Sequence, residues 1–199
     1  MWVYSEEELH SRLSKLPGRA RAGFATACAQ LMLPLYAVYE SQAHGSDEGS
    51  RKINDALEEC WNACSGGGVA AEALMTDMAG LMPDDQAEWI WECGLAENCV
   101  AAALYALRAW ANDDNAQEGV WAANQVYEAV DYVAQQYAVG AQPHTYVDIY
   151  SPGPHDPYRS LVGRLNDVLV KIETNQDDWQ TVKDMTSGDA WTAILPPRA

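Results

Sequence analysis

The chain has 199 residues and a formal net charge of −17, with 48% hydrophobic and 21% charged residues. This composition is typical of a globular protein and too apolar for a disordered one, and the length fits a single domain. A strongly negative protein is repelled by phosphate backbones and by anionic lipid surfaces, so we expect neither nucleic acid nor membrane as a partner.

The first residues predict no targeting segment. Three consecutive glutamates at 6–8 stand where a signal peptide would have a basic stretch followed by an apolar one. The most apolar stretch, 95–110, is interrupted by polar residues and falls short of a membrane span. We therefore expect a cytoplasmic protein, in which the five cysteines stay reduced and buried.

The first three helices can be placed by their start and stop signals. Ser5 and Glu8 form a capping-box pattern that opens a short helix, ended by Pro17 and Gly18. A second helix is predicted over 20–44, with Pro34 inside it, where a kink is expected. A third helix follows.

Asp47 is the predicted cap of this third helix, which stops at the glycine run 66–68. A fourth helix is predicted over 69–81. Pro83 then begins the most apolar segment, which we expect to be the central helix and which extends to Leu107.

A sixth helix is predicted after a turn at 112–115. Its apolar residues recur at alternating steps of three and four, which indicates a seam packed on another helix. These residues are Val120, Ala123, Tyr127, Val130, Ala134 and Tyr137.

The pattern breaks at 140–157, where four prolines predict a long loop, with a short extended piece at 146–150. A long helix around 158–172 and a shorter one around 179–185 follow, and the tail 187–199 is expected to be loose. The chain is thus predicted to be all-α, a single-domain bundle of about six to eight helices with one long Pro-rich loop.

The negative charge is unevenly placed along the sequence. Residues 45–157 hold nineteen acidic side chains against three basic ones, a balance of −16, whereas 12–21 is locally basic. Such a field favours a cationic partner and steers its approach, although acidity also serves solubility.

Metal and cofactor sites are not predicted. Cys60 and Cys64 would share one helix face, but no second pair of ligands follows. A di-iron bundle needs two Glu-x-x-His motifs on different helices, and Glu7 with His10 is the only one.

Catalytic residues are also hard to assign, because no nucleophile elbow or phosphate-binding glycine loop is present. Glu97 and Asn98 stand out because they interrupt the most apolar helix. The simplest interpretation is that Glu97 faces solvent while Asn98 bonds a neighbouring helix. His144 and His155 lie in the proline-rich loop and could form a site with helix acids, although surface loop histidines are usually inert.

The second helix, with Leu31 to Tyr36 around Pro34, resembles the proline-broken helix of the YjaG-like bacterial proteins, a family of unknown function. The stretch 96–103 and the leucines and acids of the last long helix are similar as well. The resemblance implies an all-α fold and a bacterial cytosolic setting, but no catalytic residue, and the loop 140–157 departs from it.

Three functions remain open, and the leading prediction is a non-enzymatic acidic binding protein. It would neutralise a basic toxin or effector by occlusion, as immunity proteins and antitoxins do. An aromatic anchor with a charged rim is expected at its interface. The predicted partner-binding residues are Asp84, Asp85, Glu88, Trp89, Trp91 and Glu92.

The alternatives are a helical scaffold that forms a homodimer or larger oligomer, and a small-molecule enzyme. The enzyme's site would lie between the central helix and the 140–157 loop, with Glu97 and His144 as its test residues.

Overall fold

The computed structural model describes residues 4–43, 45–83, 90–112, 114–141, 157–187, 191 and 195. Within these ranges the chain forms helices and no strand, so the all-α prediction is confirmed. The helices are α1 Glu6–Leu13, α2 Gly18–Ala43, α3 Glu48–Cys64, α4 Ala71–Ala79, α5 Glu92–Ala111, α6 Gln117–Ala141, α7 Pro157–Thr174 and α8 Trp179–Thr186.

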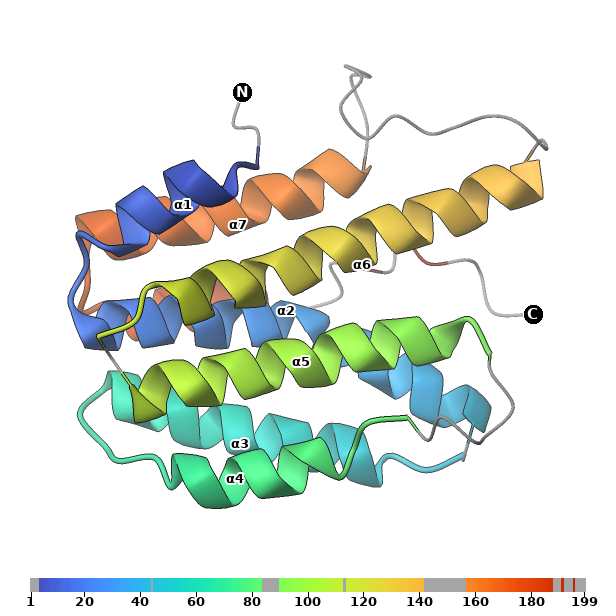
Figure 1. Ribbon diagram of the computed structural model, residues 1–199, viewed down its shortest axis with the longest axis horizontal. Helices are drawn as coiled ribbons and strands as arrows, with labels where there is room; N and C mark the ends of the chain where they lie inside the picture. Colours follow the sequence, from blue (N-terminus) through green and yellow to red (C-terminus); the bar gives the residue numbers. More distant parts are fainter. Residues whose placement is uncertain are drawn as a thin grey trace.

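Helix α2 lies at the centre of the bundle and contacts α3, α5, α6, α7 and α8 (Figure 1). Helices α5 and α6 run side by side along one face, and α4 packs on α5. The apolar sequence of α5 predicted that it would be the central helix, but α2 takes that place and α5 is its main neighbour. The buried side chains form one continuous cluster.

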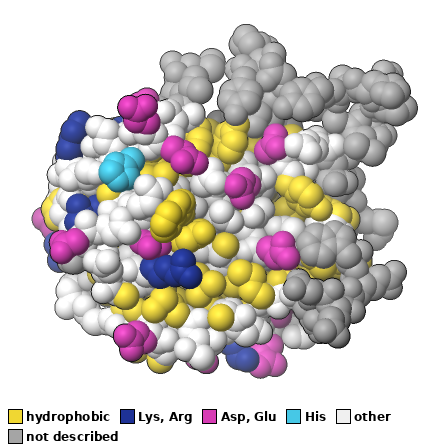
Figure 2. All heavy atoms as spheres, viewed as in Figure 1, with side chains coloured by type: hydrophobic (Ala, Val, Ile, Leu, Met, Phe, Trp, Pro, Cys, Tyr) yellow, Lys and Arg dark blue, Asp and Glu magenta, His cyan; other side chains and the backbone are white. Residues whose placement is uncertain are grey.

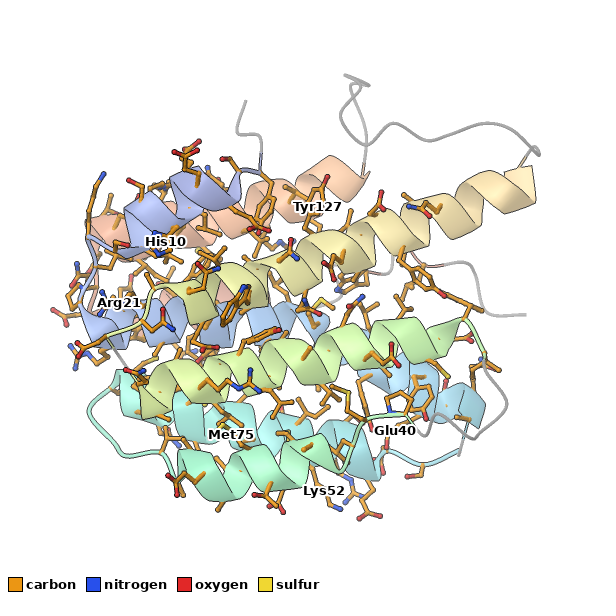
Figure 3. All side chains as sticks on the ribbon, in the orientation of Figure 1. His10, Arg21, Glu40, Lys52, Met75 and Tyr127 are labelled. Atoms are coloured by element: carbon orange, nitrogen blue, oxygen red, sulfur yellow. The ribbon has the colours of Figure 1, made fainter. Side chains whose placement is uncertain are left out.

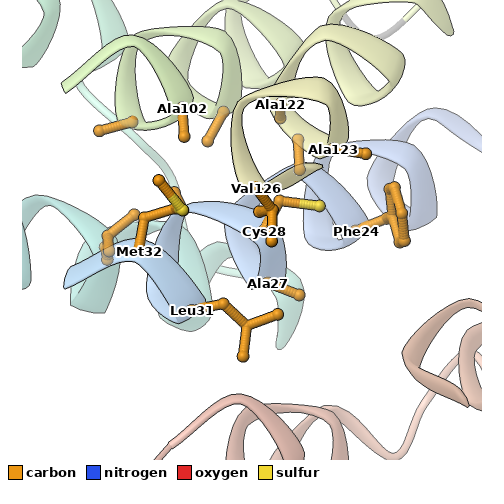
Figure 4. Packing of buried hydrophobic residues seen from close by; sticks show 14 of the residues in the cluster. Phe24, Ala27, Cys28, Leu31, Met32, Ala102, Ala122, Ala123 and Val126 are labelled. Carbon is orange, nitrogen blue, oxygen red and sulfur yellow. The ribbon is translucent and has the colours of Figure 1, made fainter. Parts of the chain in front are cut away.

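Small side chains explain why α2 sits so close to its neighbours. Its buried face holds Ala22, Ala25 and Ala29, and the facing side of α5 is similarly rich in alanine. Alanine favours the helix and lets two helix axes approach, because the distance between axes follows the size of the contacting side chains. Larger side chains such as Phe24, Leu31 and Met32 fill the remaining space (Figure 4).

The predicted start of α1 is confirmed, whereas α3 begins in a way that the sequence does not suggest. Ser5 accepts a hydrogen bond from the Glu8 backbone N–H. Asp47 occupies the cap position of α3 but makes no capping hydrogen bond with its side chain. Instead the carboxylate of Glu40, near the end of α2, accepts from the N–H groups of Gly49 (2.6 Å) and Ser50 (2.8 Å) (Figure 3).

Helix α2 continues through Pro34 and meets the C-terminal segment there. Proline has no N–H, so the carbonyl of Gln30 lacks its usual helical donor. The next carbonyl, of Leu31, accepts from the indole N–H of Trp191 at 2.6 Å. Trp191 is fully buried. The tail predicted to be loose over 187–199 is therefore anchored at this residue.

Two further boundaries differ from expectation. Helix α5 begins at Glu92, because Ile90 and Trp91 lie outside it, rather than close to Pro83. Both ends of the stretch predicted to be a proline-rich loop, 140–157, are helical, since α6 extends to Ala141 and α7 begins at Pro157. The extended piece expected at 146–150 lies outside the described residues.

Glycine at position 23 is required by the contact between α2 and α8. A Cβ atom there would lie 2.4 and 2.6 Å from two ring carbons of Trp179. We expect Gly23→Ala to lower the free energy of unfolding by up to about 2 kcal/mol, because overpacking exceeds the gain in helix propensity.

Urea unfolding of Gly23→Ala tests this, with Gly163→Ala on α7 as the matched control. No atom lies within 4 Å of the Cβ position at Gly163, so the same substitution there should be neutral or stabilising. Equal stability of the two variants would contradict the close approach of α8.

Candidate interaction face on α5 and α6

Two aromatic pairs join α5 to α6 on the outer side of the bundle. The rings of Trp91 and Tyr132 lie 6.4 Å apart, and those of Tyr105 and Trp121 lie 5.5 Å apart. These side chains are half-buried except Trp121, which is 40% exposed. In the space-filling view, hydrophobic side chains form a broken band over this part of the surface, with acidic side chains around it (Figure 2).

The position of Tyr132 depends on a glycine in α5. A Cβ atom at Gly94 would lie 3.3 Å from the Tyr132 ring, so the missing side chain lets the ring rest on α5. Position 94 therefore lies level with 132 and, since the helices are antiparallel, 105 lies level with 121. Between the aromatic pairs lie the half-buried Asn98, Ala101 and Gln125 and the exposed Glu128.

The Trp91 end of this face is acidic. Burial raises the pKa of the Tyr132 hydroxyl, and nearby negative charges, among them those of Glu92 and Glu97, raise this pKa further. The two glutamates are thus close enough to act on the ring electrostatically. An aromatic surface flanked by carboxylates can receive a cation, through the ring faces and through charge-assisted hydrogen bonds.

The opposite end carries the exposed Arg108. Its guanidinium carbon lies 5.4 Å from the centre of the Tyr105 ring, a cation–π contact. Burial raises the pKa of the nearby Glu118 carboxyl, and the positive charge of Arg108 opposes this rise. One end of the face therefore holds aromatic rings and carboxylates. The other end holds aromatic rings with Arg108 as its exposed charge, beside the half-buried Glu118.

Of the residues predicted to bind a partner, Trp91 and Glu92 belong to this face. The other four, Asp84, Asp85, Glu88 and Trp89, lie outside the described residues. No pattern in the sequence indicated Tyr105, Trp121 or Tyr132 as binding residues. The apolar pattern of the sixth helix predicted the buried side of α6, and Trp121 and Tyr132 lie beside that buried side. Tyr105 is likewise only half-buried on α5.

Glu97 and Asn98 are both half-buried, so neither is the fully buried polar group that would need a partner inside the bundle. Asn98 stands seven residues, about two helical turns, after Trp91 and so lies on the same side of α5, whereas Glu97 lies to one side of that line. The loop histidines His144 and His155 lie outside the described residues, so the enzyme site that depends on them is untested.

The cysteines are buried and free. Burial raises the pKa of the Cys60 and Cys64 thiols to about 12, which keeps them protonated and poorly nucleophilic at neutral pH. Within the described ranges no three His, Cys, Asp or Glu side chains gather in a way that could hold a metal ion.

Two arginines of the basic segment near the N-terminus are paired with acidic side chains of the same molecule. Arg12 donates two hydrogen bonds to the Glu173 carboxylate, at 2.8 and 2.7 Å, and a third to Asn166. Arg19 lies 3.5 Å from Asp177. Helix α7 and the turn after it thus offset the local positive charge that the sequence shows at 12–21.

Helix α2 is long and apolar enough to cross a membrane by length and composition. However, 72% of its apolar window is buried inside the bundle, which is the arrangement expected of a core helix.

No family model matches the chain, and no curated protein matches it either. A solved structure does: the crystal structure of a DUF416 family protein from Shewanella baltica OS155. The TM-score is 0.68 over 88% of this chain and 90% of that one, at 19% sequence identity. This likeness shows a shared helical fold.

Proposed function

We propose that this chain is a non-enzymatic binding protein that captures a cationic protein through the Trp91 end of the α5–α6 face. In this proposal it acts in the bacterial cytoplasm as an immunity or antitoxin-like protein, which occludes the working surface of a basic toxin or effector. We also propose that the chain is a distant relative of the YjaG-like bacterial proteins.

The observation that carries the proposal is the Trp91–Tyr132 pair with Glu92 and Glu97 beside it. Aromatic side chains at the centre of an interface supply most of its binding energy, and surrounding charges select the partner and accelerate its approach. A lysine or arginine of the partner would meet ring faces and carboxylates together. The net charge of −17 adds long-range attraction for a basic protein.

Affinity purification of the tagged chain from its own host tests this function, at about 50 and 500 mM salt to vary screening. We expect wild type to recover a basic protein at low salt. Recovery should fall at least about tenfold for Glu92→Lys/Glu97→Lys and for Tyr132→Ala, because charge and aromatic surface are removed separately.

The matched control is Glu6→Lys/Glu7→Lys, which makes the same change in net charge on the exposed side of α1. It should recover the partner nearly as well as wild type. The proposal fails if all four proteins recover the same set, or if both double lysine variants lose the partner equally.

A further inference from the structure

The outer faces of α5 and α6 carry residues at helical steps of three and four, so that each set forms one solvent-facing stripe. All are half-buried or exposed. The α5 stripe begins at Trp91, the residue before the helix, and continues through Gly94, Asn98, Ala101, Tyr105 and Arg108. The α6 stripe holds Trp121, Gln125, Glu128 and Tyr132.

The two ends of these stripes are complementary to each other. Trp91, Glu92 and Tyr132 form an acidic, aromatic end. Tyr105, Trp121 and Arg108 form an aromatic end whose exposed charge is positive, with the half-buried Glu118 beside it. A surface of this kind can pair with a second copy of itself. A two-fold axis lying in the face and crossing the stripes sets each end of one copy on the opposite end of the other.

Such an axis would cross α5 midway between 98 and 101 and α6 midway between 125 and 128. The register given by Gly94 with Tyr132 and Tyr105 with Trp121 puts these two midpoints level with each other. A single axis therefore serves both helices.

The side chains brought together on α5 fit in charge and size. The second copy's Arg108 would meet Trp91 and Glu92, where a cation–π contact and an ion pair are both available. The second copy's Tyr105 would meet Gly94, a large residue over the missing side chain of a small one.

The α6 stripe fits as well. Gln125 would meet the second copy's Glu128, an amide donor facing a carboxylate acceptor. Trp121 would meet the second copy's Tyr132, which adds an aromatic pair.

We propose that two copies of this chain associate through the α5–α6 face around this two-fold axis. The stripe from Trp91 to Arg108 is about 26 Å long at about 1.5 Å per residue. Two helix widths on that length give a contact below the standard size of stable interfaces, so the dimer is weak, with a dissociation constant of about 10–100 µM.

The dimer covers the surface to which we assign the cationic partner, so the two associations exclude each other. At low concentration the face is open to the partner, and at high concentration each copy shields the other's exposed Trp121. This inference does not depend on the partner's existence, because it is tested with the purified chain alone.

Sedimentation velocity of the full chain at about 0.15 M salt is the experiment, since at that salt long-range repulsion between the acidic copies is largely screened. Wild type should shift from monomer to dimer between about 5 and 500 µM. Arg108→Glu and Glu92→Arg should each raise the dissociation constant at least about tenfold by creating like-charge contacts.

The decisive variant is Arg108→Glu/Glu92→Arg, in which the two charges are exchanged. The pairing across the axis should bring its dissociation constant back to within about threefold of wild type. Arg51→Glu, an exposed residue on α3 with the same charge change as Arg108→Glu, should dimerise like wild type. Thermal unfolding checks that each variant is folded.

A monomeric wild type throughout this range overturns the proposal. The proposal also fails if the single substitutions leave the dissociation constant of the dimer unchanged. It fails as well if the dissociation constant of the exchanged variant is as high as those of the single variants.

Discussion

Replacing Glu40 with alanine is expected to lower the free energy of unfolding by about 3 kcal/mol. The carboxylate is 4% exposed and accepts from the N–H groups of Gly49 and Ser50 at the start of α3. Hydrogen bonds to a charged group each contribute about 1.5–3 kcal/mol, and the negative charge also favours the helix N-terminus. Removal leaves one buried and one half-buried N–H group without this acceptor.

Urea unfolding followed by circular dichroism measures this loss. Glu40→Gln keeps the shape and one acceptor oxygen but loses the charge, so its stability should fall between those of wild type and Glu40→Ala. Glu48→Ala, an exposed glutamate in the first turn of the same helix, should leave the unfolding midpoint nearly unchanged. If Glu40→Ala and Glu48→Ala lowered the free energy of unfolding equally, the hydrogen bonds of Glu40 to the start of α3 would not stabilise the protein measurably.

Replacing Trp191 with alanine should lower the free energy of unfolding by about 3–5 kcal/mol, the range for a fully buried aromatic side chain. The side chain is 0% exposed and its indole N–H bonds the Leu31 carbonyl. Trp191→Phe retains most of the apolar contact and removes the donor, so its loss should be about 1–2 kcal/mol.

The same urea titration separates these variants, and Trp121→Ala is the matched control. Trp121 is 40% exposed, so its removal should change the stability little. If Trp191→Ala unfolded at the same urea concentration as Trp121→Ala, the C-terminal segment would not be packed in the core.

Most of the fold could be predicted from the sequence because most of it follows from local signals. Apolar periodicity places the helices, and Ser5 caps α1 with the hydrogen bond that its spacing to Glu8 predicts. The start of α3 could not be predicted this way. Asp47 is a residue type favoured at that position, but Glu40 arrives from the preceding helix and takes the N–H groups first.

The candidate face was only half visible in the sequence. Trp91 and Glu92 could be named from their acidic, aromatic surroundings, whereas Tyr132 comes from a different helix. Tyr132 lies beside Trp91 because of the register between α5 and α6, and the small Gly94 allows this register. No local sequence pattern predicts how two helices align. The anchoring of Trp191 has the same origin, since its acceptor lies 160 residues away.

The ion pair between Arg12 and Glu173 also has a consequence for biosynthesis. The two residues are 161 positions apart, so at about 5–20 residues per second the ribosome makes Arg12 roughly 8–30 s before its partner. During this time α1 and α2 lack their acidic partners Glu173 and Asp177, and the Leu31 carbonyl of α2 lacks the indole N–H of Trp191. We therefore expect nascent chains to gain protection from proteases late and in one step, after residue 191 has emerged.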